Sequence, residues 1–267
     1  MTDLAQSPAL LGLLAGLVTW IFTTLGAATV FLRQQFSRKT LDILLGFAAG
    51  VMLAASVWSL LLPALDLTRE AWGAWSFVPP ALGFIIGAGG LRLVDYLLPH
   101  IHPLLNSKEG LGAGRMQRHF LLILAITLHN IPEALAVGVA FGAVTIDPAL
   151  GMAGAVTLML GIGLQNLPEG MAVSIPLLRE GWSRRRAFFY GQLSGLVEPV
   201  AAVAGALLAS VAMPVLPWAM AFAAGAMIFV TVEEVIPEAH ASGNGDAATM
   251  GLILGFVCMM SLDVGLG

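Results

Sequence analysis

Polar side chains that could bind a cation recur at helical spacing within three apolar stretches of the sequence. His129 and Glu133 stand four residues apart in the first stretch, and Gln165 and Glu169 have the same separation in the second. Side chains four residues apart share one face of an α-helix, so each stretch should present a polar cluster on one side. The candidate ligands in the three stretches are His129, Asn130, Glu133, Gln165, Asn166, Glu169 and Glu198.

The three glutamates of this set are flanked by apolar residues on both sides. An ionised carboxylate at the centre of a bilayer costs at least about 2.5 to 3.5 kcal/mol. The three stretches contain no Lys or Arg at a matching depth, so the compensating charge is not expected from a side chain. A bound divalent cation or a proton could supply it.

Pro132 and Pro168 lie inside the first two stretches, next to the glutamates. A proline in a helix removes one backbone hydrogen bond and frees the carbonyl four residues earlier. Free carbonyls at membrane depth need a wet cavity, a protein partner or an ion. The octapeptides NIPEALAV, at 130–137, and NLPEGMAV, at 166–173, differ at only three positions. Such a repeat in antiparallel spans is typical of a transporter site at mid-membrane depth built from proline-broken helices.

The ligand types narrow the choice of cation. One imidazole with several carboxylates suits zinc, iron, manganese, cobalt or cadmium. An all-oxygen site for magnesium or calcium would not require His129. The single cysteine, Cys258, excludes a thiolate cage as well as an intrachain disulfide. Carboxamides are weak ligands, and weak mixed ligation suits an ion that must leave the site again.

The rest of the sequence indicates what positions these residues. Of the 267 residues, 58% are apolar and 10% are charged, and the mean hydropathy is +0.90. These values exclude an ordinary soluble domain. Because a helix needs roughly 20 apolar residues to span a bilayer, the sequence predicts an all-α integral membrane protein, with eight transmembrane helices forming a single domain over residues 1–267. The predicted spans are 9–32, 41–63, 76–99, 119–142, 150–178, 186–210, 216–238 and 248–266.

The basic residues predict the orientation of the spans. If the N-terminus lies outside, ten of the 12 Lys and Arg residues fall in inner loops, as the positive-inside rule requires. We therefore expect both termini on the periplasmic or extracellular side of the cell (inner) membrane, and residues 99–118 in a cytoplasmic loop between the third and fourth helices. The net charge of −4 is spread over short loops, and no basic run is dense enough to indicate a nucleic-acid partner.

Four segments resemble the signature helices of the ZIP (Zrt/Irt-like) family of divalent metal transporters, as found in prokaryotic members. They are HNIPEALAVG, GIGLQNLPEGMAV, GQLSGLVEP and EEVIPEAH, and the order and spacing of the eight spans are also similar. The resemblance implies a binuclear metal centre in the fourth, fifth and sixth spans. Its first site would use His129, Glu133, Gln165 and Glu169, and its second site would use Asn130, Asn166, Glu169 and Glu198. The resemblance also implies cytoplasmic exit ligands among Glu233, Glu234, Glu238 and His240.

The same resemblance implies a transporter in the lipid bilayer, not an enzyme, that takes up Zn²⁺ into the cytoplasm by alternating access. Fe²⁺, Mn²⁺, Cd²⁺ and Co²⁺ are further candidate substrates, and assembly as a homodimer is left open. Many members of the family carry aspartate where this chain has Asn166. The second site would then have one negative charge fewer and bind metal more weakly.

Two other functions remain open from the sequence. An intramembrane zinc metalloprotease could hold its metal with a histidine and a glutamate on one helix, but HNIPE lacks the second histidine and the free general base of an HExxH helix. A proton-coupled carrier of an organic solute could use the same carboxylates to bind protons. No feature of the sequence marks a pocket for such a solute.

Overall fold

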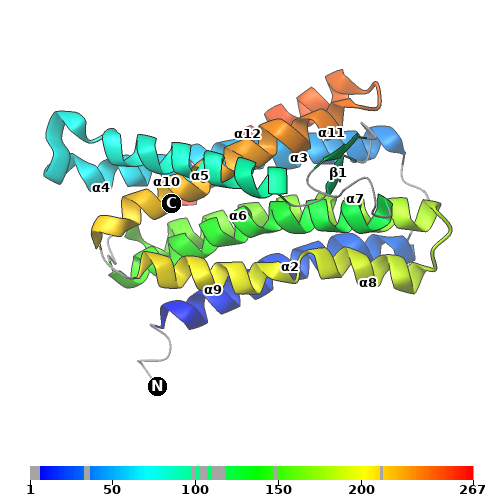
Figure 1. Cartoon of the computed structure of the whole chain (residues 1–267), viewed down its shortest axis with the longest axis horizontal. Coiled ribbons are helices and arrows are strands. Elements are labelled where there is room, and N and C mark those ends of the chain that lie inside the picture. The colour runs from blue at the N-terminus through cyan, green and yellow to red at the C-terminus, as the bar shows by residue number, and fades with distance from the viewer. Residues whose placement is uncertain are drawn as a thin grey trace.

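The computed structural model describes residues 7–32, 37–97, 100–102, 107–109, 118–146, 150–210 and 213–266. Within them, eight long helical segments run along the length of the molecule (Figure 1). The segments are α2 (Pro8–Leu32), α3 (Arg38–Ala55) continued by η1 (Ser56–Leu61) and α4 (Leu62–Trp72), α5 (Val78–Leu97), α6 (Arg118–Ile146), α7 (Met152–Arg179), α8 (Arg184–Ser194) with α9 (Val197–Ala209), α10 (Leu216–Val230) continued by η6 (Thr231–Val235) and α11 (Ile236–His240), and α12 (Gly245–Leu266).

The prediction of an all-α membrane protein is confirmed. Seven of the described segments combine the length of a membrane span with high mean hydropathy. The remaining segment is α7, which at 28 residues is long enough to cross a bilayer. The mean hydropathy of α7 is lowered by polar residues, which include Gln165, Asn166 and Glu169. These residues are candidate ligands, so the least apolar of the eight segments is one that carries part of the predicted site.

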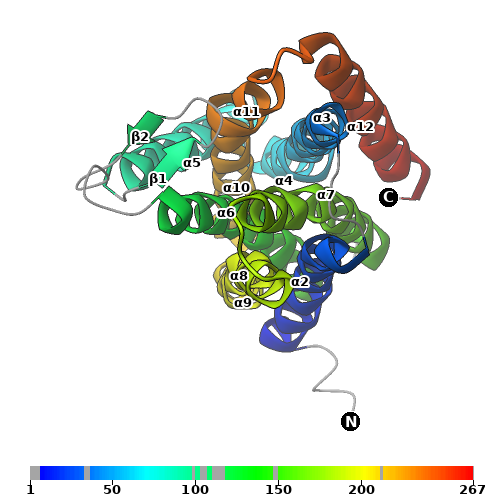
Figure 2. The same cartoon turned by 90° about the vertical axis from the view of Figure 1, so that its right-hand side faces the viewer.

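The helices pack as two groups. Helices α2, α6, α7, α8 and α9 contact one another, and so do α3, α4, α5, α10, α11 and α12. The end view in Figure 2 shows these groups one above the other. We call them the α6 bundle and the α10 bundle. They meet where α7 lies against α3 and where α6 lies against α10.

Glycines bring helix backbones together inside each bundle. A Cβ atom added at Gly138 would overlap the backbone of α9, and one added at Gly50 would overlap the backbone of α12. Small residues of this kind allow close helix packing in lipid, where the hydrophobic effect does not drive association. Among the described glycines, Gly161 alone faces the other bundle, and it meets the flexible side chain of Met259. Backbone contacts therefore hold each bundle together, whereas side chains form the contact between the bundles.

Prolines shape several helices without ending them. Helix α6 continues through Pro132 and α7 continues through Pro168, so these helices are not broken as the sequence suggested. Each proline removes one hydrogen bond, but neighbouring helices support the chain on both sides. The π-helical segments η1 and η6 each end two residues before a proline, Pro63 and Pro237. In both segments the amide that follows bonds to the carbonyl five residues earlier, which widens the turn.

The segment 99–118, predicted as a loop, contains a short antiparallel hairpin. Its strands are β1 (His100–His102) and β2 (Ser107–Glu109). Strand β1 contacts α6, the helix that carries the first three candidate ligands. The hairpin therefore lies at the end of the molecule where α6 begins.

Candidate metal centre

The seven candidate ligands gather inside the α6 bundle. Each of them is at most 5% exposed. Asn166 bonds to Glu198, and Asn130 bonds to the backbone at Ser194, just before α9, so the three helices bring these residues together. Helix α6 carries His129, Asn130 and Glu133, helix α7 carries Gln165, Asn166 and Glu169, and the first turn of α9 carries Glu198.

Hydrogen bonds connect the carboxamides to the carboxylates. Gln165 donates from Nε2 to Asn166 Oδ1 over 3.2 Å and to Glu169 Oε1 over 3.4 Å. Asn166 in turn donates from Nδ2 to Glu198 Oε2 over 2.8 Å. Thr23 of α2 donates to the other oxygen of Glu198, Oε1, over 2.6 Å. Both oxygens of Glu198 therefore have partners, and Thr23 is a contributor that the sequence did not reveal, because a threonine in an apolar span carries no distinctive signal.

A break in the sixth span positions Glu198. Helix α8 ends at Ser194 and α9 begins at Val197, so backbone carbonyls at the break lack helical partners. Asn130 donates from Nδ2 to the carbonyl of Ser194 over 3.0 Å and satisfies one of them. Glu198 then lies in the first turn of α9, where the helix dipole favours a negative charge. The break thus joins α6 to α9 and places a carboxylate beside α7.

Several buried oxygens of the cluster have no hydrogen-bond partner among the described residues. They are Asn130 Oδ1, both carboxylate oxygens of Glu133, Gln165 Oε1 and Glu169 Oε2. A buried polar atom without a partner costs about 1 to 3 kcal/mol, so a cluster of such atoms strongly favours a bound partner. Native proteins rarely leave such groups unpaired, so the oxygens indicate a place where a ligand binds.

The carboxylate and imidazole groups of the cluster do not by themselves form a complete set of metal ligands among the described residues. No three His, Cys, Asp or Glu side chains within the described part of the chain are arranged to hold a metal by themselves. Carboxamides supply part of the donor set, and the imidazole of His129 contacts Glu234 of the other bundle. His129 Nε2 lies 2.6 Å from Glu234 Oε2. The binuclear centre implied by the resemblance therefore stays a prediction.

The contact of His129 with Glu234 joins the two bundles. Glu234 is 8% exposed and belongs to η6 of the α10 bundle, where the π turn sets its direction. Asp95 of α5 lines a small pocket with these two residues and accepts a hydrogen bond from Arg92 over 2.8 Å. Asp95 was missed from the sequence, although an acidic residue inside a predicted apolar span was a usable signal. The structure thus adds one carboxylate to the polar residues near His129.

The other predicted exit ligands do not join this cluster. Glu233 is exposed on η6. Glu238 Oε1 lies 3.8 Å from a guanidinium nitrogen of Arg38 at the start of α3. One ring nitrogen of His240 faces a backbone carbonyl of α11 at 2.9 Å, and the other lies 3.0 Å from Thr249 Oγ1. Of the four residues, Glu234 is the one whose carboxylate meets His129.

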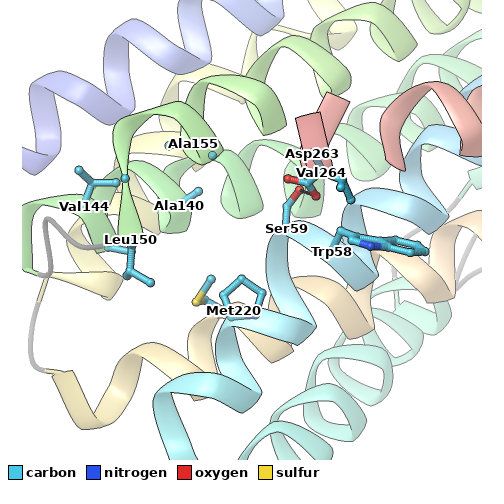
Figure 3. Close-up of a pocket in the computed structure, with 13 residues that line it drawn as sticks. Trp58, Ser59, Ala140, Val144, Leu150, Ala155, Met220, Asp263 and Val264 are labelled. Carbon is cyan, nitrogen blue, oxygen red and sulfur yellow. Dashed lines mark hydrogen bonds between the residues drawn. The ribbon is translucent and has the colours of Figure 1, made fainter. Parts of the chain in front are cut away.

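A cavity of about 340 Å³ lies between the bundles near the end of α6 and the start of α7 (Figure 3). Its walls are mostly apolar, and Asp263 of α12 is the one charged side chain among the residues that line it. Asp263 Oδ2 accepts a hydrogen bond from Ser59 over 2.7 Å. Ala140 in the wall of the cavity lies two helical turns, about 10 Å, along α6 from Glu133.

Comparison with known proteins extends the likeness to the whole chain. The family described as "ZIP Zinc transporter" matches residues 106–263, which is more than half of the chain. The chain is 44% identical to "Zinc transporter ZIP11" of Xenopus tropicalis, over 98% of each protein. It is 42% identical to "Zinc transporter GufA" of Myxococcus xanthus, over 96% of this chain and 99% of that protein. Its identity to "Zinc transporter ZupT" of Chlorobaculum parvum is 34%, over 93% of each.

These similarities agree with the four motifs and with the helices observed. They favour neither a metalloprotease nor a carrier of organic solutes, because the family consists of transport proteins whose described members are zinc transporters. The chain is a multi-pass membrane protein that belongs to the ZIP family of zinc transporters.

Proposed function

We propose that this protein takes up Zn²⁺ into the cytoplasm through the buried polar cluster of α6, α7 and α9, by alternating access. The observation that carries the proposal is the set of unpaired oxygens on Asn130, Glu133, Gln165 and Glu169. Several of these oxygens can coordinate one metal ion at once. A proton on one carboxylate pairs that oxygen with only one other acceptor, so a single proton cannot serve the whole set.

The donor chemistry supports zinc. Imidazole nitrogen and carboxylate oxygen are common zinc ligands, and the similar proteins described above carry the name zinc transporter. His129 would complete the first site with Glu133, Gln165 and Glu169 once it leaves Glu234. The same donors accept Fe²⁺, Mn²⁺, Cd²⁺ and Co²⁺, which we expect to compete with zinc.

The second site would share Glu169 and use Asn130, Asn166 and Glu198. The amide of Asn166 donates to Glu198, so this side chain stabilises part of the carboxylate charge. A neutral amide in this place supports weaker metal binding than a second carboxylate would give. We therefore propose that the second site modulates the first.

The distribution of charge supports an orientation of the chain in the membrane. Arginines concentrate where α7 ends and α8 begins, and this end of the molecule is expected in the cytoplasm of a cell (inner) membrane protein. The cavity with Asp263 then opens to the periplasmic or extracellular side, where both termini lie. Asp263 would attract the cation, the central cluster would bind it, and Glu234 and Asp95 would receive it on the inner side.

The two bundles supply the moving parts. Each bundle is held by close backbone contacts at glycines, whereas side chains join one bundle to the other. Such an interface allows one rigid group of helices to shift against the other. Zinc and Glu234 would compete for Nε2 of His129. Zinc binds the lone pair of an unprotonated Nε2, whereas the carboxylate of Glu234 accepts a hydrogen bond from a protonated Nε2. Metal binding would therefore release a contact that holds the bundles in the observed arrangement.

Uptake of zinc by reconstituted protein tests the proposal. Liposomes that contain the purified protein and an enclosed zinc indicator should accumulate external zinc, and Glu169→Ala and His129→Ala should each abolish uptake. Glu70→Ala is the matched control, because Glu70 is an exposed glutamate of α4 outside the predicted ligand set. Unchanged uptake in both site variants would remove the assignment. Cleavage of a peptide substrate without zinc uptake would favour the protease instead.

A further inference from the structure

A second cleft in the molecule is built from arginine and aromatic side chains. It has a volume of about 410 Å³ and lies at the start of α8, away from the metal centre. Its lining consists of Trp182, Arg185, Arg186, Phe189 and Tyr190. None of these residues takes part in the proposed transport site. The cleft therefore needs a separate explanation.

The turn before α8 gives the cleft its shape. Helix α7 ends at a left-handed glycine, Gly181, whose amide bonds to Leu178 O over 3.1 Å. The amide of Trp182 bonds to Leu177 O over 3.1 Å, which completes a Schellman motif and fixes the direction in which the chain leaves α7. Ser183 then caps α8 by accepting from the amide of Arg186. Trp182 is thus placed beside the first turns of α8.

The aromatic wall of the cleft is a packed cluster. The Trp182 and Tyr190 rings meet edge to face with centroids 5.3 Å apart, and the Phe189 and Tyr190 rings do so at 5.4 Å. Arg185 precedes Phe189 by four residues and Arg186 precedes Tyr190 by four, so each guanidinium lies on the same helix face as one ring. The arrangement presents two cations beside an ordered aromatic surface.

Two arginines of this region, Arg185 and Arg186, carry positive charge into the lining of the cleft. Residues 179–186 include four arginines and one acid, Glu180. Arg185 and Arg186 are exposed, and neither forms an ion pair with a described residue. A guanidinium presents its N–H groups in a planar fork that matches the oxygens of a phosphate. The unmet charge therefore favours an anionic group with phosphate geometry.

The position of the cleft identifies the source of that phosphate. Arg184–Ala209 is a candidate membrane span, so its first residues lie at the level of the lipid headgroups. Trp and Tyr are enriched at this level, and basic pockets on the inner side of membrane proteins bind anionic headgroups. Apolar side chains continue from the cleft along the span, and the exposed ones include Phe189 of α8, Leu196 at the break, and Val200 and Leu207 of α9. An acyl chain attached to the phosphate could lie along these residues.

We propose that the cleft between Trp182 and Tyr190 binds the phosphate headgroup of an anionic phospholipid through Arg185 and Arg186. The lipid would hold the connection between α7 and α8 at the membrane surface. Because α7 carries three of the candidate ligands, the bound lipid would also fix the end of a helix that forms the metal centre. The proposal requires only a multi-pass membrane protein, so it stands apart from the direction of transport and from the metal.

Lipid retention in native mass spectrometry tests the site. Purified protein in detergent is mixed with phosphatidylglycerol or with phosphatidylcholine, and the lipid-bound fraction is measured at about 0.15 M ionic strength. Each basic residue near an anionic lipid contributes roughly a factor of five in binding, so R185Q/R186Q should weaken phosphatidylglycerol binding by about 30-fold. Phosphatidylcholine should bind weakly to all variants. Equal retention of phosphatidylglycerol by the wild type and R185Q/R186Q would overturn the proposal.

The control variant also removes two positive charges from this end of the molecule, but at residues outside the cleft. Lys39 and Arg184 are exposed and do not line the cleft, so K39Q/R184Q should retain phosphatidylglycerol within about threefold of the wild type. An equal loss in the control variant would show general attraction to a basic surface and would contradict a site. If R185Q/R186Q does not fold, R185K/R186K keeps the charge but loses the planar fork, and it should bind with intermediate strength. Displacement of the lipid by inorganic phosphate at equal concentration would show that the cleft recognises free phosphate, which would also contradict the proposal.

Discussion

Replacing Glu133 with glutamine should stabilise the metal-free protein and abolish its stabilisation by zinc. Glu133 is 0% exposed, and neither of its carboxylate oxygens has a hydrogen-bond partner among the described residues. Glutamine has nearly the same shape, keeps only one of the unpaired acceptors, and gains an NH₂ group. That group can donate to a neighbouring unpaired oxygen of Gln165 or Glu169. The variant thus supplies a hydrogen-bond donor where the wild type has only acceptors.

The expected size follows from the number of atoms affected. Glu133→Gln removes one unpaired acceptor and satisfies at least one other, and each change contributes about 1 kcal/mol or more. A gain of about 2 kcal/mol corresponds to a rise in Tm of roughly 4 to 8 °C for a protein of this size. In the wild type, zinc at a hundred times its Kd should add about 2.7 kcal/mol. In the variant, zinc should leave Tm nearly unchanged, because the first site loses one of its two carboxylates and the second site is proposed to bind metal weakly.

Thermal unfolding in detergent measures both effects, first with a chelator and then with added zinc. Glu70→Gln is the matched control, since the same chemical change at an exposed position outside the predicted ligand set should shift Tm by no more than about 2 °C. The control should also keep the full response to zinc. A lower Tm for Glu133→Gln in chelator would show that the protein itself satisfies the carboxylate. An intact zinc response in that variant would refute the role of Glu133 as a ligand.

Three further variants test other parts of the site. Thr23→Val removes the 2.6 Å hydrogen bond to Glu198, so it should lower Tm in chelator by several degrees, whereas Thr23→Ser keeps the hydroxyl and should have little effect. Asn166→Asp places a second carboxylate 2.8 Å from Glu198, so it should destabilise the metal-free protein and increase the Tm shift on adding zinc; a smaller shift than in the wild type would contradict the second site. Asp263→Asn removes the one charge that lines the outer cavity, so the KM for zinc uptake should rise several-fold with little change in maximal rate, and an unchanged KM would exclude Asp263 from the path.

The spans and the polar cluster could be predicted because they depend on local patterns. A run of about 20 apolar residues marks a span wherever it occurs, and the separation of His129 from Glu133 places both on one helix face. Burial of the seven candidate ligands followed, since each lies at the centre of such a run. The second span was predicted too short, because Pro63 lies near the start of α4, where a helix tolerates proline.

The remaining features depend on which helices meet, and the sequence does not encode that locally. The partner of His129 is Glu234, which lies more than one hundred positions later in the sequence. Glu234 belongs to the π-helical segment η6, whose wider turn changes the direction of its side chains relative to an α-helix. The break between α8 and α9 precedes Pro199 without any helix-ending residue other than Gly195, so its position was not evident. The division into two bundles rests on backbone contacts at glycines such as Gly138 and Gly50, whose partners lie on distant helices.

The central claim is that a zinc ion binds to the carboxylate and imidazole side chains of α6 and α7 inside the membrane. X-ray absorption at the zinc edge of the purified protein tests it most directly, because the spectrum reports the ligand atoms themselves. We predict a shell of nitrogen and oxygen at about 2.0 to 2.1 Å that disappears in a Glu133→Ala, Glu169→Ala double variant. A sulfur shell near 2.3 Å, or the same oxygen and nitrogen shell in the double variant, would contradict the account.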